Sequence, residues 1–338
     1  MKQSQPVMEG SAPAGDAGQP RMKLWLGTKP SRTVLRIAAA VIGAGVIGGG
    51  LALIWPEPDP MAAASPSKDD PASLAPLPER SITLLLVGVD SEAINDPSNR
   101  AAPKGPANAD SLILIRAEAG QALQVLQMPT ELAVQLPGRE GLQPLARAYR
   151  EGGVALTADV IAEILGLPAG KPDRYLVMPR QALRTLVDGL GEVEVSLNQS
   201  YKREDKAQNY TVNLQAGRQT LNGRQAEQLA RHRPNANDDG PRRTRQESLL
   251  RGLHDQLRQT NAIALLPDVI GEVSGQVSTD LTPSEMLSLM AAALSSLEPP
   301  VISGLKLAPR AGQQQLRELM SDQSLPLWPP EPNATAGN

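Results

Sequence analysis

From residue 80 onward, short apolar runs alternate with polar loops, and the runs predict the strands of one sheet. Ile82–Val87 is a continuous apolar run, which is typical of a strand buried on both faces. This run leads to Asp90 at its carboxyl end, where α/β sheets place their ligand chemistry. Further apolar or alternating runs predict strands at Ser111–Ile115, Leu123–Met128, Ala133–Leu136, Tyr175–Met178, 193–195 and Tyr210–Leu214.

Helices are expected between these strands. Apolar residues at helical spacing predict helices at Thr157–Leu165, Arg180–Leu190 and Ala226–Ala230, and in a longer helix that begins near Gly240. Thr157 is the expected N-cap of the first. Pro241 suits the first position of the last, because proline lacks the N–H that a helix start leaves unpaired. Thr282–Glu285 has the capping-box pattern.

The N-terminal part of the chain has a different pattern. Val34–Trp55 contains an uncharged run about as long as the roughly 20 residues of a transmembrane helix. Basic residues precede it and acidic residues follow it, so the positive-inside rule places the N-terminus in the cytoplasm. A cleaved signal peptide is the alternative, with a small-residue cleavage site in Met61–Ser65. Residues 1–33 have the composition of a disordered tail, and residues 56–79 that of a Pro/Ala/Ser linker.

Composition narrows the chemistry of the globular part, which we expect at residues 80–310, with a C-terminal tail at 311–338. The net charge of −3 gives no electrostatic case for nucleic acid, and with 3 Trp, 4 Tyr and no Phe there are few platforms for stacking bases. The absence of cysteine excludes disulfides and thiolate metal sites. With 2 histidines, a histidine-based triad or zinc site is not expected.

The stretch Leu229–Leu250 gathers arginines around Asp238 and Asp239. These arginines are Arg231, Arg233, Arg242, Arg243 and Arg245. Guanidiniums beside a helix start can bind phosphate or diphosphate, because each planar fork engages two oxygens. The alternative is a solvated basic helix start that Asp238, Asp239 and Glu247 neutralise.

Asp90 and Asp110 form a second candidate site. Each lies at the edge of an expected strand, and the two meet on one side of the sheet if the strands are parallel neighbours. Two carboxylates there can hold a partly hydrated Mg²⁺ whose remaining positions are taken by substrate phosphates. The alternative is a pair of loop aspartates that cap turns.

The order of these motifs resembles the LytR-CpsA-Psr family, also called the cell envelope-related transcriptional attenuator domain. The matching segments are LLLVGVD, ADSLILI, MPTEL, YREGG, LVDGLGEVEV, LQAGRQTLNGRQAEQLARHR and DDGPRRTRQ. The resemblance covers roughly residues 80–300. It implies an α/β fold, namely an α-β-α layered single domain with a mixed central sheet, preceded by one transmembrane helix at residues 34–55.

The resemblance also implies a function. Members look like phosphotransferases that move a glycopolymer from a polyprenyl-diphosphate carrier onto peptidoglycan or another cell-wall acceptor. The implied cofactor is Mg²⁺, and the isoprenoid chain would lie in an apolar groove between helices and sheet. The implied partners are the polyprenyl-diphosphate-linked glycan, the peptidoglycan acceptor and the membrane, with no nucleic acid. The expected location is the cell membrane, single-pass, with the globular domain extracytoplasmic (periplasmic), a topology that conflicts with direct transcriptional attenuation.

By motif position, Asp90 and Asp110 correspond to the acidic residues for metal and diphosphate. The implied diphosphate-binding residues are Arg231, Arg233, Arg242, Arg245 and Gln246. Asp110, Arg231 and Arg233 are the expected catalytic residues, and Asp110 is the best candidate for the general base.

Two family arginines are replaced in this chain, by Asn108 and Thr130, and the family's asparagine is Ala146. Charge-assisted contacts are typically worth about 1.5–3 kcal/mol each, so two losses would weaken substrate or transition-state binding. The second hypothesis is therefore a catalytically weakened paralogue that binds polyprenyl phosphates or envelope partners without turnover. The candidates to compensate are Lys104, Arg147 and Arg150.

Overall fold

The computed structural model describes residues 70–96, 106–205, 210–235, 239–309, 316–322 and 328. The expected membrane segment Val34–Trp55 lies outside this range, as do the N-terminal tail and most of the linker. Within the described part of the chain, no helix is both long and apolar enough to cross a membrane.

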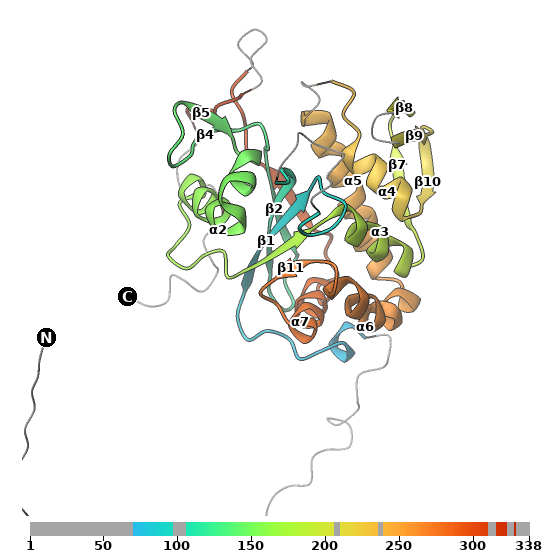
Figure 1. The fold of residues 1–338 in the computed structure, drawn as a ribbon. Helices are drawn as coiled ribbons and strands as arrows, with labels where there is room; N and C mark the ends of the chain where they lie inside the picture. The colour runs from blue at the N-terminus through green and yellow to red at the C-terminus, as the bar shows by residue number, and fades with distance from the viewer. Residues whose placement is uncertain are drawn as a thin grey trace, which may run out of the picture. The chain divides into compact units, whose positions relative to one another are not determined.

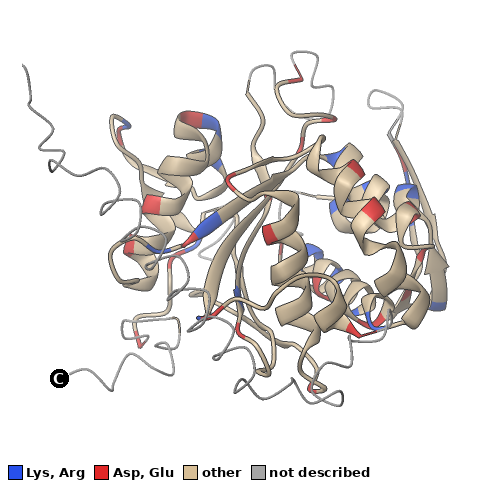
Figure 2. Cartoon of the chain, turned by 90° about the horizontal axis from the view of Figure 1, so that it is seen from below, with Lys and Arg blue, Asp and Glu red and all other residues tan. Residues whose placement is uncertain are grey.

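The centre of the domain is a mixed sheet of six strands (Figure 1). In spatial order the strands are β11 (Ser278–Thr279), β6 (Arg174–Met178), β1 (Ile82–Val89), β2 (Ala109–Ala117), β3 (Gln124–Met128) and β12 (Val301–Gly304). β1 pairs in parallel with β6 and antiparallel with β2, so the expected mixed sheet is present. Figure 2 shows its central strands largely free of charge, with Lys, Arg, Asp and Glu gathered on the surrounding helices and loops.

The pairing of β1 with β2 corrects the reason why Asp90 and Asp110 lie at one edge. We expected parallel neighbours, but the strands are antiparallel, and Val89 faces Ala109 in the register. Asp90 follows the carboxyl end of β1, whereas Asp110 is the second residue of β2. An antiparallel pair brings those two ends together, and a parallel pair would have separated them.

The two faces of β1 differ, although its apolar run predicted burial on both. Leu85 and Val87 are fully buried, whereas Leu84 and Leu86 alternate with them and are only partly buried. Leu84 and Leu86 line a cavity. The strand is continuously apolar because one face packs in the core and the other borders apolar space.

Helices cover both faces of the sheet (Figure 1). They are α2 (Ala146–Leu165), α3 (Arg180–Gly189), α4 (Gly223–Arg231), α5 (Asp239–Leu257), α6 (Thr260–Ser274) and α7 (Pro283–Leu294), and a short 3-10 turn, η1 (Pro71–Ser73), precedes the sheet. α2 packs against Leu85, Val87 and Leu114 in one core cluster. α6 and α7 pack in a second cluster that Leu84 and Leu86 join from the opposite face.

α2 begins earlier than expected. It starts at Ala146, and its helical geometry is interrupted at Gly152 and Gly153, where φ is −145° and +64°. Thr157 is therefore no N-cap; it lies inside the second half of the helix, where its hydroxyl donates to the carbonyl of Gly153 at 2.8 Å. The sequence pattern revealed only the half that follows the two glycines.

Among the described residues, three two-stranded sheets accompany the central one. They are β4 (Ala133–Gln135) with β5 (Leu142–Pro144), β7 (Val193–Leu197) with β10 (Gly217–Leu221), and β8 (Tyr201–Asp205) with β9 (Tyr210–Leu214). A third core cluster joins β7, β9 and β10 to α4 and α5. Through Leu229 and Leu249 this cluster anchors the end of α4 and the middle of α5, on either side of most of the arginine-rich stretch.

The capping-box signal behaves as expected, whereas Pro241 is the third residue of α5 and not the first. Thr282 and Glu285 form the predicted capping box of α7, and α4 begins with a capping box of its own at Asn222. Beyond residue 310, Trp328 is 3% exposed within the cluster that holds α2, and the guanidinium of Arg116 lies 5.0 Å from its ring centroid. Part of the chain past the expected domain boundary therefore packs on the domain.

Candidate functional site

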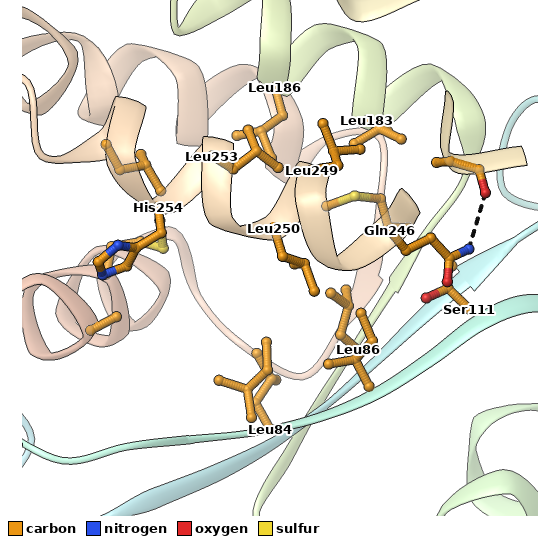
Figure 3. Close-up of a pocket in the computed structure, with 18 of the residues that line it drawn as sticks. Leu84, Leu86, Ser111, Leu183, Leu186, Gln246, Leu249, Leu250, Leu253 and His254 are labelled. Atoms are coloured by element: carbon orange, nitrogen blue, oxygen red, sulfur yellow. Dashed lines mark hydrogen bonds between the residues drawn. The ribbon is translucent and has the colours of Figure 1, made fainter. Parts of the chain in front are cut away.

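A cavity of about 290 Å³ lies between the sheet and the helices α3, α5 and α7. Its walls are almost entirely aliphatic along most of their length (Figure 3). The central liners are Leu84, Leu86, Leu183, Leu186, Leu250 and Leu253. Figure 3 shows Leu250 of α5 and Leu86 of β1 facing one another across it. Such a space suits a flexible hydrocarbon, because aliphatic walls make no directional demands on the occupant.

One end of the cavity is polar. Asp110, Arg180, Glu227, Arg231 and Gln246 line it and contact one another. Figure 3 places Gln246 and Ser111 at this end and His254 at the opposite one. We call these five residues the polar end of the cavity, and the aliphatic remainder its apolar end. An amphipathic ligand would therefore lie in one orientation.

Asp110 is held between two arginines. Its Oδ1 accepts a hydrogen bond from Nη1 of Arg242 at 3.0 Å, and its Oδ2 lies 3.9 Å from Nε of Arg231. Arg231 also donates through Nη1 to Oε1 of Glu227 at 3.0 Å, and its guanidinium lies 5.0 Å from the ring centroid of Tyr210. Since Arg231 is the last residue of α4, its charge also complements the helix dipole there.

Asp239 organises the start of α5. It is 2% exposed and accepts from Arg242 through Oδ1 and from Arg233 through Oδ2, each at 3.0 Å. Burial raises the pKa of Asp239 above its ordinary value, against the opposing effect of Arg242 and Arg233. Arg242 and Arg245 are each 4% exposed, so the alternative of a solvated basic helix start does not hold for them.

The structure separates the roles of the expected diphosphate residues. Arg231 and Gln246 line the cavity, whereas the residues lining it do not include Arg233, Arg242 or Arg245. Arg245 donates to the carbonyl of His232 and lies over the ring of Tyr201. Gln246 donates to the carbonyls of Ala230 and Asp110 at 3.1 Å and 3.4 Å, and so ties α5 to α4 and β2.

The two replaced arginine positions have local partners. The backbone N–H and the side-chain amide of Asn108 donate to the two carboxylate oxygens of Asp90, at 3.0 Å and 3.4 Å. The hydroxyl of Thr130 accepts from Nη2 of Arg242 at 2.9 Å. These side chains hold Asp90 and Arg242 in place and bring no positive charge of their own.

The candidate compensators are engaged elsewhere. Arg147 donates to Glu151 and Gln143, and Arg150 donates to the carbonyl of Pro106. Lys104 lies outside the described residues. Arg180, at the start of α3, lies at the polar end together with Arg231, and the sequence did not single it out.

Glu227 is the other residue that sequence reasoning missed. Its side chain is 7% exposed and bridges Arg180, Arg184 and Arg231. Burial alone would raise the pKa of Glu227, but Arg184, Arg231 and Arg180 more than offset this and hold it below its ordinary value. The sequence carried one sign of this role: Glu227 falls on the side of the short helix α4 that otherwise carries apolar residues.

The expected metal ligands at this end are carboxylates. Among the described residues, no three or more His, Asp or Glu side chains converge as a closed metal site. Asp110 lines the cavity and its side chain is 28% exposed. One or two carboxylates completed by ligand oxygens and water are how proteins usually hold Mg²⁺, so Asp110 suits that donor set. Asp90 is 6% exposed, and the residues lining the cavity do not include it.

Comparisons with known proteins identify the family and the fold. The sequence model of the LytR_cpsA_psr family matches residues 59–308. The chain is 25% identical over 163 residues to the polyisoprenyl-teichoic acid–peptidoglycan teichoic acid transferase TagU of Enterococcus faecalis, covering 48% of this chain and 51% of that protein. It is 24% identical over 204 residues to the regulatory protein MsrR of Staphylococcus aureus, covering 60% and 57%.

The chain thus spans between half and three fifths of these curated relatives. The crystal structure of TagV from B. subtilis superposes with a TM-score of 0.58 at 20% identity, covering 72% of this chain and 91% of that one. At this identity the superposition shows a shared fold, an α/β domain with a mixed central sheet.

Proposed function

The chain belongs to the LytR_cpsA_psr family, and from that premise we propose that it transfers a glycopolymer from a polyprenyl-diphosphate carrier to peptidoglycan or another cell-wall acceptor. One observation carries the proposal. A single cavity is aliphatic along its length and ends at Arg231, Arg180 and Asp110. The apolar end would bind the polyprenyl chain, because each CH₂ group buried there contributes about 0.8 kcal/mol. The diphosphate of the same carrier would then lie beside the guanidiniums of Arg231 and Arg180.

The proposed step is substitution at the phosphorus next to the sugar. An acceptor hydroxyl forms a new P–O bond, the bond to the bridging oxygen breaks, and polyprenyl phosphate leaves with that electron pair. Arg231 stabilises the charge that develops on the leaving phosphate, because it faces the cavity and a buried guanidinium interacts strongly with an oxyanion. Asp110 is the proposed acceptor of the hydroxyl proton.

Arg242 and Asp239 act behind this contact. Arg242 fixes Asp110 through a 3.0 Å hydrogen bond, and Asp239 in turn fixes Arg242. Arg233 holds the second oxygen of Asp239. We propose that Arg233 and Arg245 support the site and that Gln246 shapes the polar end.

Mg²⁺ is proposed as the cofactor, held by Asp110 with help from Asp90. When bound, it would neutralise diphosphate charge. Removing divalent cations with EDTA is expected to stop the release of polyprenyl phosphate, and added Mg²⁺ to restore it. Release that proceeds unchanged in EDTA would contradict the metal requirement but not the transfer.

The topology is part of the proposal. We propose that residues 34–55 anchor the chain in the cell membrane with the globular domain outside the cytoplasm. A reporter enzyme that is active only outside the cytoplasm, fused after Asn338, should be active. Activity of a reporter restricted to the cytoplasm would contradict this topology.

The second candidate is a paralogue that binds the carrier without turnover. Asn108 and Thr130 favour it, because both stand where the family resemblance implies arginine. The deciding assay incubates the purified full chain in detergent with polyprenyl-diphosphate disaccharide, Mg²⁺ and peptidoglycan fragments. Release of polyprenyl phosphate that disappears in Asp110→Ala supports the transferase. Binding without release supports the paralogue.

A further inference from the structure

A cluster of five charged side chains lies beside the polar end of the cavity and joins three segments of the chain. Arg180 and Arg184 come from α3, Glu227 and Arg231 from α4, and Glu92 from the loop after β1. Glu227 contacts all three arginines, and Glu92 contacts Arg180 and Arg184. The cluster thus has three guanidiniums and two carboxylates, and the carboxylate of Asp110 lies beside it, 3.9 Å from Arg231.

Arg180 and Arg231 share one carboxylate oxygen. Nη1 of Arg180 lies 3.3 Å from Oε1 of Glu227, and Nη1 of Arg231 lies 3.0 Å from the same atom. Two guanidiniums that close to a common oxygen are near enough to bracket one phosphate group. Both arginines line the cavity, where a phosphate would compete with Glu227 and Glu92 for their guanidiniums.

Each of these arginines has hydrogen-bonding capacity left. Nε of Arg180 and Nε of Arg231 are buried without a hydrogen-bond partner. Their side chains are 16% and 12% exposed. A buried donor without a partner is unfavourable, and an anion that reached either Nε would supply the missing acceptor.

The backbone fixes where Arg180 lies. The N–H of Arg180 donates to the carbonyl of Ser91 at 3.1 Å, and the N–H of Gln181 donates to the carbonyl of Glu92 at 3.1 Å. These bonds tie the first turn of α3 to the loop that follows β1. Arg180 therefore reaches the polar end from the first turn of α3, the helix that packs beside α4.

Arg184 can be compared with Arg180, because both belong to α3 and have the same ion-pair partners. It lies one helical turn after Arg180 and contacts the same two partners, Glu227 and Glu92. Its side chain is 25% exposed, but it does not appear among the residues lining the cavity. The two arginines share ion-pair partners and differ in access to a ligand.

We infer that Arg180 is a diphosphate-binding residue, which together with Arg231 brackets one phosphate of the carrier lipid. It supplies positive charge that Asn108 and Thr130 do not, and it does so from α3. The inference rests on the proposed function, because it takes the ligand to be a lipid diphosphate.

The test titrates the purified full chain, in detergent, with farnesyl diphosphate and with farnesol. Arg180→Gln is expected to weaken binding of farnesyl diphosphate by about 10- to 100-fold, because a charge-assisted contact is lost. Binding of farnesol, which has no phosphate, should stay unchanged. The affinity of Arg180→Lys for farnesyl diphosphate should lie between those of the wild type and Arg180→Gln. Lysine keeps the positive charge but lacks the planar guanidinium that can donate two hydrogen bonds.

Arg184→Gln is the matched control, expected to change both affinities by less than about threefold while losing comparable ion pairs. Thermal unfolding of each variant shows whether the fold is kept. The inference is overturned if Arg180→Gln binds farnesyl diphosphate like the wild type, or if it loses farnesol equally. It is also overturned if Arg184→Gln matches Arg180→Gln. A wild type that binds no farnesyl diphosphate would contradict the proposed function itself.

Discussion

The apolar and polar ends of the cavity differ in the kind of interaction that forms them. The apolar end takes its leucines from four elements, β1, α3, α5 and α7, and no single side chain dominates it. The polar end depends on a few buried charges, each with a named partner, such as Asp110 with Arg242. The free energy of apolar contacts grows with the area buried. A buried ion pair instead becomes strongly unfavourable when one partner is removed, because the other charge stays buried without compensation. Substitutions at the two ends should therefore differ in size and in kind.

The largest effect is expected for Arg242→Gln. Removing this guanidinium leaves Asp239 and Asp110 without their main partner, and breaking a buried pair costs about 3–5 kcal/mol. Urea unfolding should show that loss, and release of polyprenyl phosphate should fall below detection. Arg251→Gln is the control on the same helix, because its pair with Glu247 is exposed and is worth less than about 1 kcal/mol. Equal stability of the two variants would contradict this account of α5.

Leu250→Asp tests the apolar end. Leu250 lines the cavity and is only partly buried, so a carboxylate there should spare the fold and repel a hydrocarbon. Losing a leucine contact is worth about 1.5–3 kcal/mol, so affinity for farnesol and farnesyl diphosphate should fall roughly 10- to 100-fold. Titration of both ligands measures this. Leu297→Asp, at a position 89% exposed, should change neither affinity, and an equal loss there would point to a general surface effect.

Arg233→Gln should have a smaller effect than Arg231→Gln. Arg233 pairs with Asp239 from a side chain that is 37% exposed, which discounts the interaction to about 1 kcal/mol or less. The affinity of Arg233→Gln for farnesyl diphosphate should fall less than about fivefold. Arg231→Gln should lose about tenfold or more, because this residue lines the cavity. A greater loss for Arg233→Gln would reverse the roles assigned to the two.

The smallest effect concerns pH and His254 at the far end. Burial lowers the pKa of His254, so the folded protein favours the neutral imidazole. The unfolded chain takes up a proton near pH 6.5, and the folded chain only at lower pH. Stability is therefore complete above about pH 6.5 and declines as the pH falls from there through the folded pKa. Thermal unfolding at pH 7.5 and 5.5 should show a smaller decline in His254→Gln, and an equal decline would contradict this.

The polar end was more predictable from the sequence than the apolar end. Asp110, Arg231 and Gln246 belong to local motifs whose spacing is visible in the chain, and the structure brings them together. The leucines of β1 were read as core on both faces, because a pattern of apolar residues does not distinguish a packed neighbour from a lined cavity. Only the three-dimensional arrangement shows that Leu84 and Leu86 border open space.

Arg180 and Glu227 could not be predicted for a different reason. Their contact joins residues 47 positions apart. Arg180 lies outside the segments that resemble the family, and Glu227 lies inside one of them with no sign of its distant partner. The start of α2 was missed because Gly152 and Gly153 break the helical pattern before Thr157. Long-range ion pairs and interrupted helices depend on packing that periodicity does not report.

The central claim is that one cavity holds both parts of a lipid diphosphate. The most direct measurement is calorimetric titration of the wild type with farnesyl diphosphate, alone and in the presence of saturating farnesol or saturating inorganic diphosphate. We expect farnesyl diphosphate to bind more tightly than either part, and each part to compete with it. If saturating farnesol leaves the affinity for farnesyl diphosphate unchanged, the two ends do not serve one ligand, and the account is contradicted.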